Sequence, residues 1–170
     1  MNTKQKVQNE PVRNDLVIAS PVGKLRLVAS EKGLVAIDVR SDAKKNVTAK
    51  NASAQAILIK TKKQLEQYFA GKRTSFDVAL DLVGTEFQVR AWRALCRIPF
   101  GKTISYGQQA ANIKKPKAFR AVGSANGKNP IPIIVPCHRV VASDGSLGGY
   151  SLGLRMKKQL LVLEGVSEAE

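Results

Sequence analysis

Two different patterns of hydrophobic and polar residues divide the chain near Gly84. Before it, residues 15–20, 24–30 and 34–39 are short, mostly aliphatic segments separated by turns that contain glycine, which predicts three strands. The middle segment alternates its side chains, as in a sheet with one buried face. The first part of the chain therefore predicts a small antiparallel sheet.

A helix is predicted over residues 53–70, where apolar residues recur at helical spacing until Gly71 ends the pattern. Residues 76–82 predict one more strand, whereas residues 1–13 predict a polar tail and residues 41–51 a polar connection. The helix residues expected to face inward are Ile57, Leu58, Leu65 and Phe69. We find no chemistry-bearing motif in this half and interpret it as a scaffold.

Beyond Gly84 the pattern becomes helical. Thr85 and Gln88 have the spacing of a capping box, which predicts a helix over residues 86–98. Cys96 falls close to its apolar stripe and is expected to be a small buried hydrophobic residue. The apolar stripe consists of Phe87, Ala91, Leu95 and Ile98, and a basic stripe consists of Arg90, Arg93 and Arg97.

A second capping box, Ser105 with Gln108, predicts a short helix that ends near Ile113. Pro116 suits the first position of a further helix that runs to about Asn126. Two short helices joined by a tight turn predict a helix-turn-helix. In its second helix Phe119 and Val122 are expected to pack inward, and the opposite face is expected to carry Lys117, Arg120 and Ser124.

The charge is strongly basic. Lysine and arginine number 28 against 13 acids, which gives a formal charge of +15 and a pI near 10.1. Between residues 84 and 143 there are ten basic residues and one acid, Glu86. This concentration favours a nucleic acid as partner over a merely solvated surface. With no apolar run of membrane-spanning length and no signal segment, we expect a soluble protein of the cytoplasm, most readily a prokaryotic one.

Residues 131–141 form an apolar, strand-like stretch that brings Cys137 beside His138, the single histidine of the chain. A free thiol with a pKa near ~8.5 is mostly protonated at neutral pH, so a nucleophilic cysteine needs a group that favours the thiolate. Neighbouring strand residues point to opposite faces, so a direct contact between the two side chains would need a turn or a bridging water. Two thiols and one histidine fall short of a zinc site.

Three blocks of sequence stand in a fixed order: residues 123–130, the stretch around Cys137, and residues 147–153. In these blocks the chain resembles the O6-alkylguanine-DNA alkyltransferase family, closely from about Gly84 to Gly165. The resemblance implies a ribonuclease-H-like α/β domain over residues 1–83, with a small antiparallel sheet and a helix. It implies a mostly α-helical, winged-helix-like domain with the helix-turn-helix over residues 84–170.

The resemblance also implies roles for residues of the site. Cys137 is the alkyl acceptor, and a water connects it to His138, which Glu164 orients. Tyr106 assists the departing guanine, and Arg120 enters the duplex in place of the flipped base. Further DNA contacts fall to Lys117, Ser124 and Arg93, and the substrate pocket to Asn129, Val140, Tyr150 and Ser151.

Leu152 stands where many relatives have glycine, which leaves the tolerance of the pocket for large alkyl groups open. The implied reaction is an irreversible, single-turnover transfer of an alkyl group from O6-alkylguanine in double-stranded DNA to the cysteine, without cofactor or metal and by a monomer. The main alternative is a catalytically silent binding protein that recognises alkylated DNA and recruits other factors, but relatives of that kind replace the cysteine. A thiol hydrolase is disfavoured by the basic surroundings.

Overall fold

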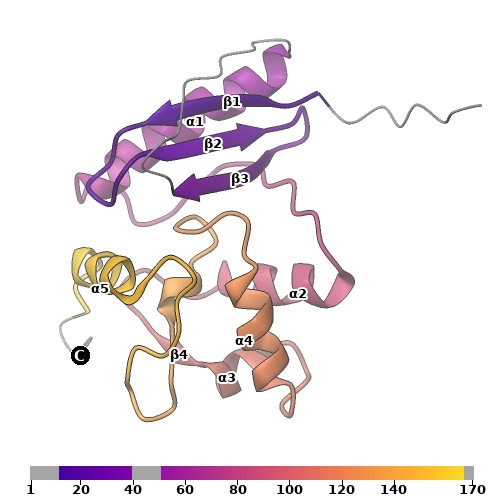
Figure 1. Ribbon diagram of the computed structural model, residues 1–170, viewed down its shortest axis with the longest axis vertical. Helices are drawn as coiled ribbons and strands as arrows, with labels where there is room; N and C mark the ends of the chain where they lie inside the picture. The colour runs from indigo at the N-terminus through magenta and orange to yellow at the C-terminus, as the bar shows by residue number, and fades with distance from the viewer. Residues whose placement is uncertain (1–11, 40–50, 167–170) are drawn as a thin grey trace, which may run out of the picture.

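The computed structural model describes residues 12–39 and 51–166 of the chain. The tail and the connection predicted over residues 1–13 and 41–51 fall almost entirely outside these ranges. Figure 1 shows two stacked parts: a sheet with one long helix, and beneath it the remaining helices. An extended segment leads from one part to the other.

The upper part is built on a three-stranded antiparallel sheet in the order β1-β2-β3. Its register pairs Leu16 with Leu27, and Leu27 with Ile37. The alternation in the middle strand holds over its first half, since Leu25 and Leu27 are fully buried while Arg26 is half-buried, but Val28 on the opposite face is buried too. The strands are β1 (Asn14–Ile18), β2 (Leu25–Ala29) and β3 (Leu34–Val39), as the sequence predicted.

The helix α1 (Ala52–Phe69) lies against this sheet and confirms the predicted helix. Asn51 caps it, with its side chain accepting a hydrogen bond from the backbone N–H of Ala54. Of the residues expected to face inward, Leu58 and Leu65 are fully buried, whereas Ile57 and Phe69 are half-buried against the core.

Residues 76–82, predicted as a strand, form no strand. They pair with the sheet at one parallel bridge, where Leu34 N donates to Ala79 O and Asp81 N donates to Leu34 O, each at 2.8 Å. The alternation that suggested a strand still has a physical meaning, since every second side chain is partly buried against the core. These side chains are Phe76, Val78, Leu80 and Leu82.

The lower part is helical. Both predicted capping boxes are present: Gln88 N donates to Thr85 Oγ1, and Gln108 N donates to Ser105 Oγ. In each box the glutamine side chain accepts from the backbone N–H of its capping residue. The α-helices of this part are α2 (Glu86–Leu95), α3 (Tyr106–Asn112), α4 (Phe119–Gly127) and α5 (Leu154–Leu163).

The start of α4 differs from the prediction. Pro116 does not open the helix but lies in a turn closed by Ala118 N donating to Lys115 O at 2.8 Å, a place that suits the fixed φ of proline. The helix begins three residues later, at Phe119. Phe119 is therefore 48% exposed instead of packed inward, while Val122 is fully buried as expected.

Cys96 is also placed differently from the prediction. It is exposed, because α2 ends at Leu95 and Cys96 serves as its C-terminal cap outside the buried stripe. Its Sγ lies 3.6 Å from the carbonyl oxygen of Trp92.

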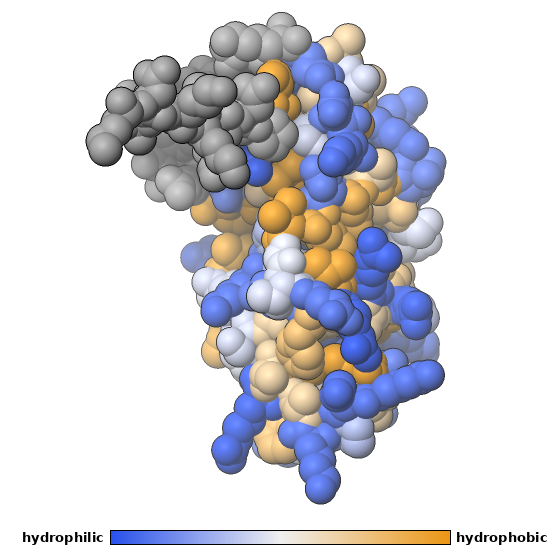
Figure 2. Space-filling view, turned by 90° about the vertical axis from the view of Figure 1, so that its right-hand side faces the viewer, coloured by the Kyte–Doolittle hydropathy of each residue, from blue (hydrophilic) through white to orange (hydrophobic). Residues whose placement is uncertain are grey.

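The two parts share one hydrophobic core. It includes Leu25, Leu58 and Tyr68 from the upper part with Leu95 and Leu160 from the lower part. A backbone hydrogen bond from Ile37 N of β3 to Pro130 O also joins them, at 2.9 Å. Figure 2 shows hydrophobic residues gathered at mid-height on one side of the molecule and hydrophilic side chains projecting from the lower part. No helix within residues 12–39 and 51–166 is long and apolar enough to cross a membrane.

Candidate active site

The approach to Cys137 is a series of turns and not the predicted strand. Residues 130–136 contain three prolines, which lack the N–H groups that a strand ladder requires. Val135 N instead donates to Ile131 O at 2.9 Å, and Cys137 N donates to Val135 O at 2.8 Å. Ile133 is fully buried with a φ of 75°, a left-handed conformation that costs a β-branched residue of order 1–3 kcal/mol. Burial, not sheet pairing, explains the apolar sequence.

Asn129 stabilises this chain reversal directly after α4. Its Nδ2 donates to Val135 O at 2.7 Å and to Cys137 Sγ at 3.1 Å. Its Oδ1 accepts from Ile131 N at 3.0 Å. One side chain thus connects the end of α4 to the thiol.

Cys137 opens the 3-10 helix η1 (Cys137–Arg139). Its three side chains are nearly or fully buried, His138 completely. Directly after it β5 (Val140–Val141) pairs in parallel with β4 (Ile104–Ser105), which fixes the position of the turn. The turn required to bring the thiol and the imidazole to the same interior is therefore present, although no hydrogen bond joins their side chains among the described residues.

Glu164, the residue that follows α5, contacts the imidazole of His138. His138 Nε2 lies 2.7 Å from Glu164 Oε1. Arg139 binds the same carboxylate with two nitrogens, Nε to Oε2 at 2.8 Å and Nη2 to Oε1 at 3.0 Å. Burial alone would favour the neutral acid, but the hydrogen bonds from His138 and Arg139 outweigh it and lower the pKa of Glu164 to about 2.

An ionised Glu164 fixes the tautomer of His138. Because the carboxylate can only accept, the proton lies on Nε2, and Nδ1 of the neutral ring is left as an acceptor. Burial lowers the pKa of His138 more than Glu164 raises it, so the ring is neutral at neutral pH. Nδ1 is buried and has no hydrogen-bond partner among the described residues. The ring therefore has the form that a general base requires.

Burial raises the pKa of the Cys137 thiol. The hydrogen bond from Asn129 and the charge of Lys157 act in the opposite direction, as does the hydroxyl of Tyr150. That hydroxyl is buried and has no partner of ordinary hydrogen-bond geometry among the described residues, so it lies close to the thiol without full alignment. A thiol in this setting needs a base to become the nucleophile.

A cavity of about 190 Å³ opens onto Cys137. Tyr106 forms one wall, and its hydroxyl donates to Gly149 O at 3.3 Å. Gly148 has a φ of 65°, and a Cβ there would come within 3.2 Å of the Tyr106 ring, so glycine is required for the loop to approach. The lining consists of Tyr106, Gly123, Asn126, Gly127, Cys137, Gly149, Tyr150 and Ser151.

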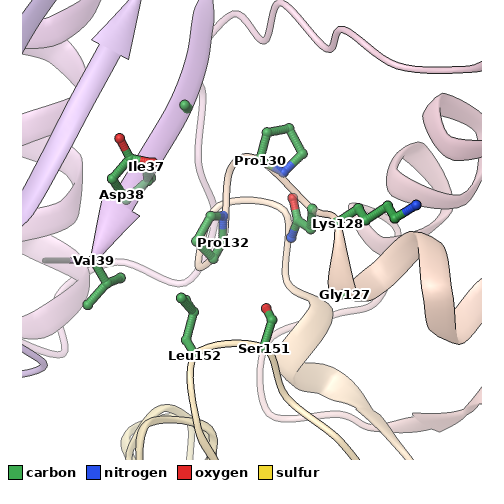
Figure 3. Close-up of a pocket in the computed structure, with 11 residues that line it drawn as sticks. Ile37, Asp38, Val39, Gly127, Lys128, Pro130, Pro132, Ser151 and Leu152 are labelled. Atoms are coloured by element: carbon green, nitrogen blue, oxygen red, sulfur yellow. The ribbon is translucent and has the colours of Figure 1, made fainter.

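A larger groove of about 400 Å³ lies beside this cavity, between β3 and the loop before α5. Figure 3 shows Leu152 pointing from the loop toward Pro132 and Val39. Leu152 lines this groove and is not among the residues around the thiol. Its bulk therefore narrows the space between the two parts of the molecule instead of the cavity itself.

Lys157 is a site residue that the sequence analysis missed. It is fully buried, and its Nζ donates to the carbonyl oxygens of Val140 (2.6 Å), Leu147 and Gly149 (3.3 Å). Burial lowers its pKa to about 8. It ties the loop over the cavity to β5. The signal in the sequence was a lysine on the buried stripe of α5, three residues before Leu160.

Of the predicted pocket residues, Tyr150 and Ser151 line the cavity, whereas Asn129 reaches it through its bond to the thiol. Val140 lies outside the lining, and its carbonyl accepts from Lys157. Arg139, two positions after Cys137 in the sequence, donates hydrogen bonds to Glu164.

The residues predicted to contact DNA are all exposed. Arg120 and Ser124 share the outer face of α4, opposite the buried Val122, and the Arg120 guanidinium lies 5.8 Å from the Phe119 ring centroid. Lys117 lies in the turn before α4 and not on the helix itself. The further predicted contact, Arg93, is on α2.

In the described part of the chain, no group of three or more histidine, cysteine or acidic residues has the arrangement of a metal site. Cys137 and His138 are instead engaged with Asn129 and Glu164.

Fold and site together define a class: a small sheet domain joined to a helical domain, in which a buried cysteine lies beside a histidine–glutamate pair. Two family models match this chain. Residues 16–82 match the ribonuclease-like domain of 6-O-methylguanine DNA methyltransferase, and residues 86–166 match its DNA-binding domain. The chain belongs to the 6-O-methylguanine DNA methyltransferase family.

Individual relatives agree with this assignment. The methylated-DNA–protein-cysteine methyltransferase of Methanosarcina barkeri is 47% identical over 149 residues, which cover 87% of this chain and 94% of that protein. The structure of Mycobacterium tuberculosis O6-methylguanine methyltransferase is similar with a TM-score of 0.79 and 42% identity, over 94% of this chain and 96% of that one. The M. tuberculosis OGT in complex with DNA is similar with a TM-score of 0.76 and 45% identity, over 90% and 92%.

Proposed function

We propose that this protein repairs DNA by transferring an alkyl group from the O6 atom of guanine to Cys137. The observation that carries the proposal is the buried thiol at a cavity, backed by a neutral histidine whose Nδ1 can accept a proton. The family membership and the names of the relatives support it. The presence of Cys137 also disfavours a catalytically silent binding protein, because such a protein needs no thiol beside a base.

The reaction is a displacement at carbon. The thiol proton passes through a bridging water to His138 Nδ1, and the sulfur attacks the alkyl carbon. The bond between that carbon and O6 breaks, its electron pair stays with guanine, and guanine takes up one proton, so that protons balance overall. The hydroxyl of Tyr106 lies at the cavity wall and donates to Gly149 O before the base enters, and in the reaction it turns this proton toward the departing base. The product is a thioether, which does not return to the thiol, and no cofactor takes part.

Loop and backbone groups position the base. Tyr150 and Ser151 close over it, and Asn129 orients the thiol through its hydrogen bond to Sγ. The backbone of Cys137 and Val140 reads the edge of the base. The close approach of the loop to Tyr106 supports this arrangement.

The duplex is bound by α3 and α4, used as a helix-turn-helix in a winged-helix-like domain. Their exposed face carries Arg120 and Ser124, and Lys117 and Arg93 flank it. To expose the alkylated base the protein must flip it out of the stack, at a cost of roughly a few kcal/mol. Arg120 fills the space that the base leaves, and minor-groove contact, which reads little sequence, suits a lesion at any position.

The domain division at residues 83 and 84, the monomeric state and the cytoplasmic location expected from the sequence stay predictions. The matched family segments end at residue 82 and begin at residue 86, in support of the division.

The test is the fate of the thiol. The protein is mixed with an excess of duplex DNA that carries one O6-methylguanine, and its mass is followed. We expect one equivalent of lesion to be consumed and one methyl group to appear on Cys137. Cys137→Ser should bind DNA without transfer, and Cys96→Ser, the matched control at an exposed cysteine, should transfer fully. Continued turnover under excess DNA, or a methyl group elsewhere, contradicts the proposal.

A further inference from the structure

Glu164 receives a hydrogen bond from the other part of the molecule. The hydroxyl of Tyr68, near the end of α1, donates to Glu164 Oε1 at 2.7 Å, across 96 positions of sequence. The same oxygen faces His138 Nε2 at 2.7 Å and Arg139 Nη2 at 3.0 Å. The second oxygen, Oε2, accepts from Arg139 Nε and from Gly101 N. A residue of the sheet domain thus shares the oxygen that holds the catalytic imidazole.

The position of this hydroxyl is determined by packing. Tyr68 is fully buried, and its ring is surrounded by Phe69, Phe76 and Phe100 at centroid distances of 5.4, 5.3 and 6.1 Å. A ring held on three sides has little freedom to turn its hydroxyl elsewhere. Burial is the main cause that raises the pKa of Tyr68, and the adjacent carboxylate raises it further. The hydroxyl therefore remains a donor throughout the working pH range.

We propose that Tyr68 is a positioning residue of the active site: its hydrogen bond to Glu164 Oε1 moderates the pull of that oxygen on the His138 Nε2 proton and so widens the pH range in which the buried His138 is neutral and ready to accept the thiol proton. The proposal rests on the function proposed above, because it concerns the base of that reaction. It makes the sheet domain a part of the catalytic apparatus and not only a scaffold.

The direction follows from the charge on Oε1. Each hydrogen bond donated to a carboxylate oxygen spreads part of its negative charge, so an oxygen with three donors attracts each proton less than one with two. Without the Tyr68 hydroxyl, Oε1 stabilises a protonated His138 more strongly. His138 would then bind a proton at a higher pH, and a protonated ring cannot take the proton of the thiol.

The other charged and titratable groups around this pair come from several elements. Arg139 and Cys137 belong to η1, and Lys157 belongs to α5. Cys96 follows α2 and lies close enough to Arg139 for the positive charge of Arg139 to act on the Cys96 thiol. Removing the Tyr68 hydroxyl changes none of these side chains chemically, so we assign the expected change in His138 titration to one hydrogen bond.

The chain offers a direct measurement, because His138 is its only histidine. Tyr68→Phe keeps the ring and removes only the oxygen. We expect nuclear magnetic resonance of the histidine-labelled, tag-free protein to show Nε2–H in both proteins. The midpoint of His138 titration should rise in Tyr68→Phe by about half a pH unit, a fraction of the effect of a hydrogen bond to a charged group.

The same shift should appear in the reaction with free O6-methylguanine, which needs no DNA contact. Below the midpoint the variant should react about threefold more slowly, as a shift of about half a unit requires. Well above the midpoint, where His138 is neutral in both proteins, the reaction rates of wild type and Tyr68→Phe should agree within about twofold. A merely structural loss would lower the rate equally at every pH.

The matched control is Phe76→Leu, which disturbs the ring cluster and leaves the hydrogen bond intact. It should lower stability without moving the His138 midpoint. An unchanged or lowered midpoint in Tyr68→Phe, or an equal shift in Phe76→Leu, would overturn the proposal. If the wild-type protein failed to transfer alkyl groups, the proposed function would fall, whereas the resonance titration would still decide the role of Tyr68.

Discussion

Replacing Glu164 by glutamine keeps the shape of the side chain and removes a buried charge that three side chains and one backbone N–H contact. Arg139 is 6% exposed, and its guanidinium would lose its ionic partner. Breaking a buried ion pair by removing one partner costs about 3–5 kcal/mol. We expect the free energy of unfolding of Glu164→Gln to fall by that amount at pH 7.

The pH dependence gives an independent estimate. The pKa of Glu164 falls from its ordinary 4.5 to about 2 in the folded protein, against burial and because of the hydrogen bonds from His138 and Arg139. A depressed carboxyl pKa contributes stability above 4.5, which is lost as pH falls toward 2, by about 3 kcal/mol in total. Glu164→Gln has no such group, so the difference between the two proteins should shrink over this window.

The assay is urea unfolding followed by the fluorescence of Trp92, the single and nearly buried tryptophan. The formal charge of +15 destabilises both proteins as pH falls and cancels largely in the difference. Burial lowers the pKa of His138, so this residue destabilises both proteins as pH falls below its unfolded value of about 6.5, and its protonation in each folded protein is followed by the resonance titration described above. Glu66→Gln is the matched control: its exposed ion pair with Lys62 predicts a loss of less than about 1 kcal/mol. Parallel stability curves for wild type and Glu164→Gln between pH 4.5 and 2 would refute this account of the carboxylate.

Three further predictions concern DNA and the thiol. Arg120→Ala should slow repair of duplex DNA far more than reaction with free O6-methylguanine, and a mismatch opposite the lesion should partly restore the rate; equal losses on both substrates would point to a damaged pocket. Lys117→Ala should weaken binding to all sequences alike and reduce the slope of log affinity against log salt by about 0.9, and a sequence-dependent loss would contradict a phosphate contact. Lys157→Met, in a Cys96→Ser background, should raise the pH at which Cys137 is alkylated by iodoacetamide, since a nearby positive charge is removed; no change would show that Lys157 acts only on the loop.

The elements that the sequence predicted well are those whose signals are local. The strands of the sheet and the long helix α1 follow from periodicity, and both capping boxes hold because each joins residues three positions apart. The predicted start of α4 was wrong because Pro116 suits a turn as well as the first turn of a helix. Local preference alone cannot choose between the two.

Apolar content was mistaken for strand structure at two places. Residues 76–82 lack a partner beyond one bridge, and the approach to Cys137 contains prolines that forbid a ladder. In both places the hydrophobic side chains pack against the core, fully buried before Cys137 at Ile131, Ile133 and Val135 and partly buried in residues 76–82. Burial of side chains and hydrogen bonding of the backbone in a sheet are separate properties, and an apolar run predicts only the burial.

In the site, the reactive residues could be predicted from the sequence, but most of their surroundings could not. The pairing of Cys137 with His138 is visible in the sequence because the two are neighbours, but the groups that set their protonation come from far along the chain. Glu164 lies 26 positions after His138, and Tyr68 lies 96 positions before Glu164. Nothing in the local pattern of α1 distinguishes Tyr68 from an ordinary core aromatic residue. A substitution there would look like a change to the scaffold, yet by the geometry of Glu164 Oε1 it changes the proton affinity of the only histidine. In a protein whose cysteine reacts only once, the sheet domain thus contributes to the pH range of that reaction as well as to the stability of the fold.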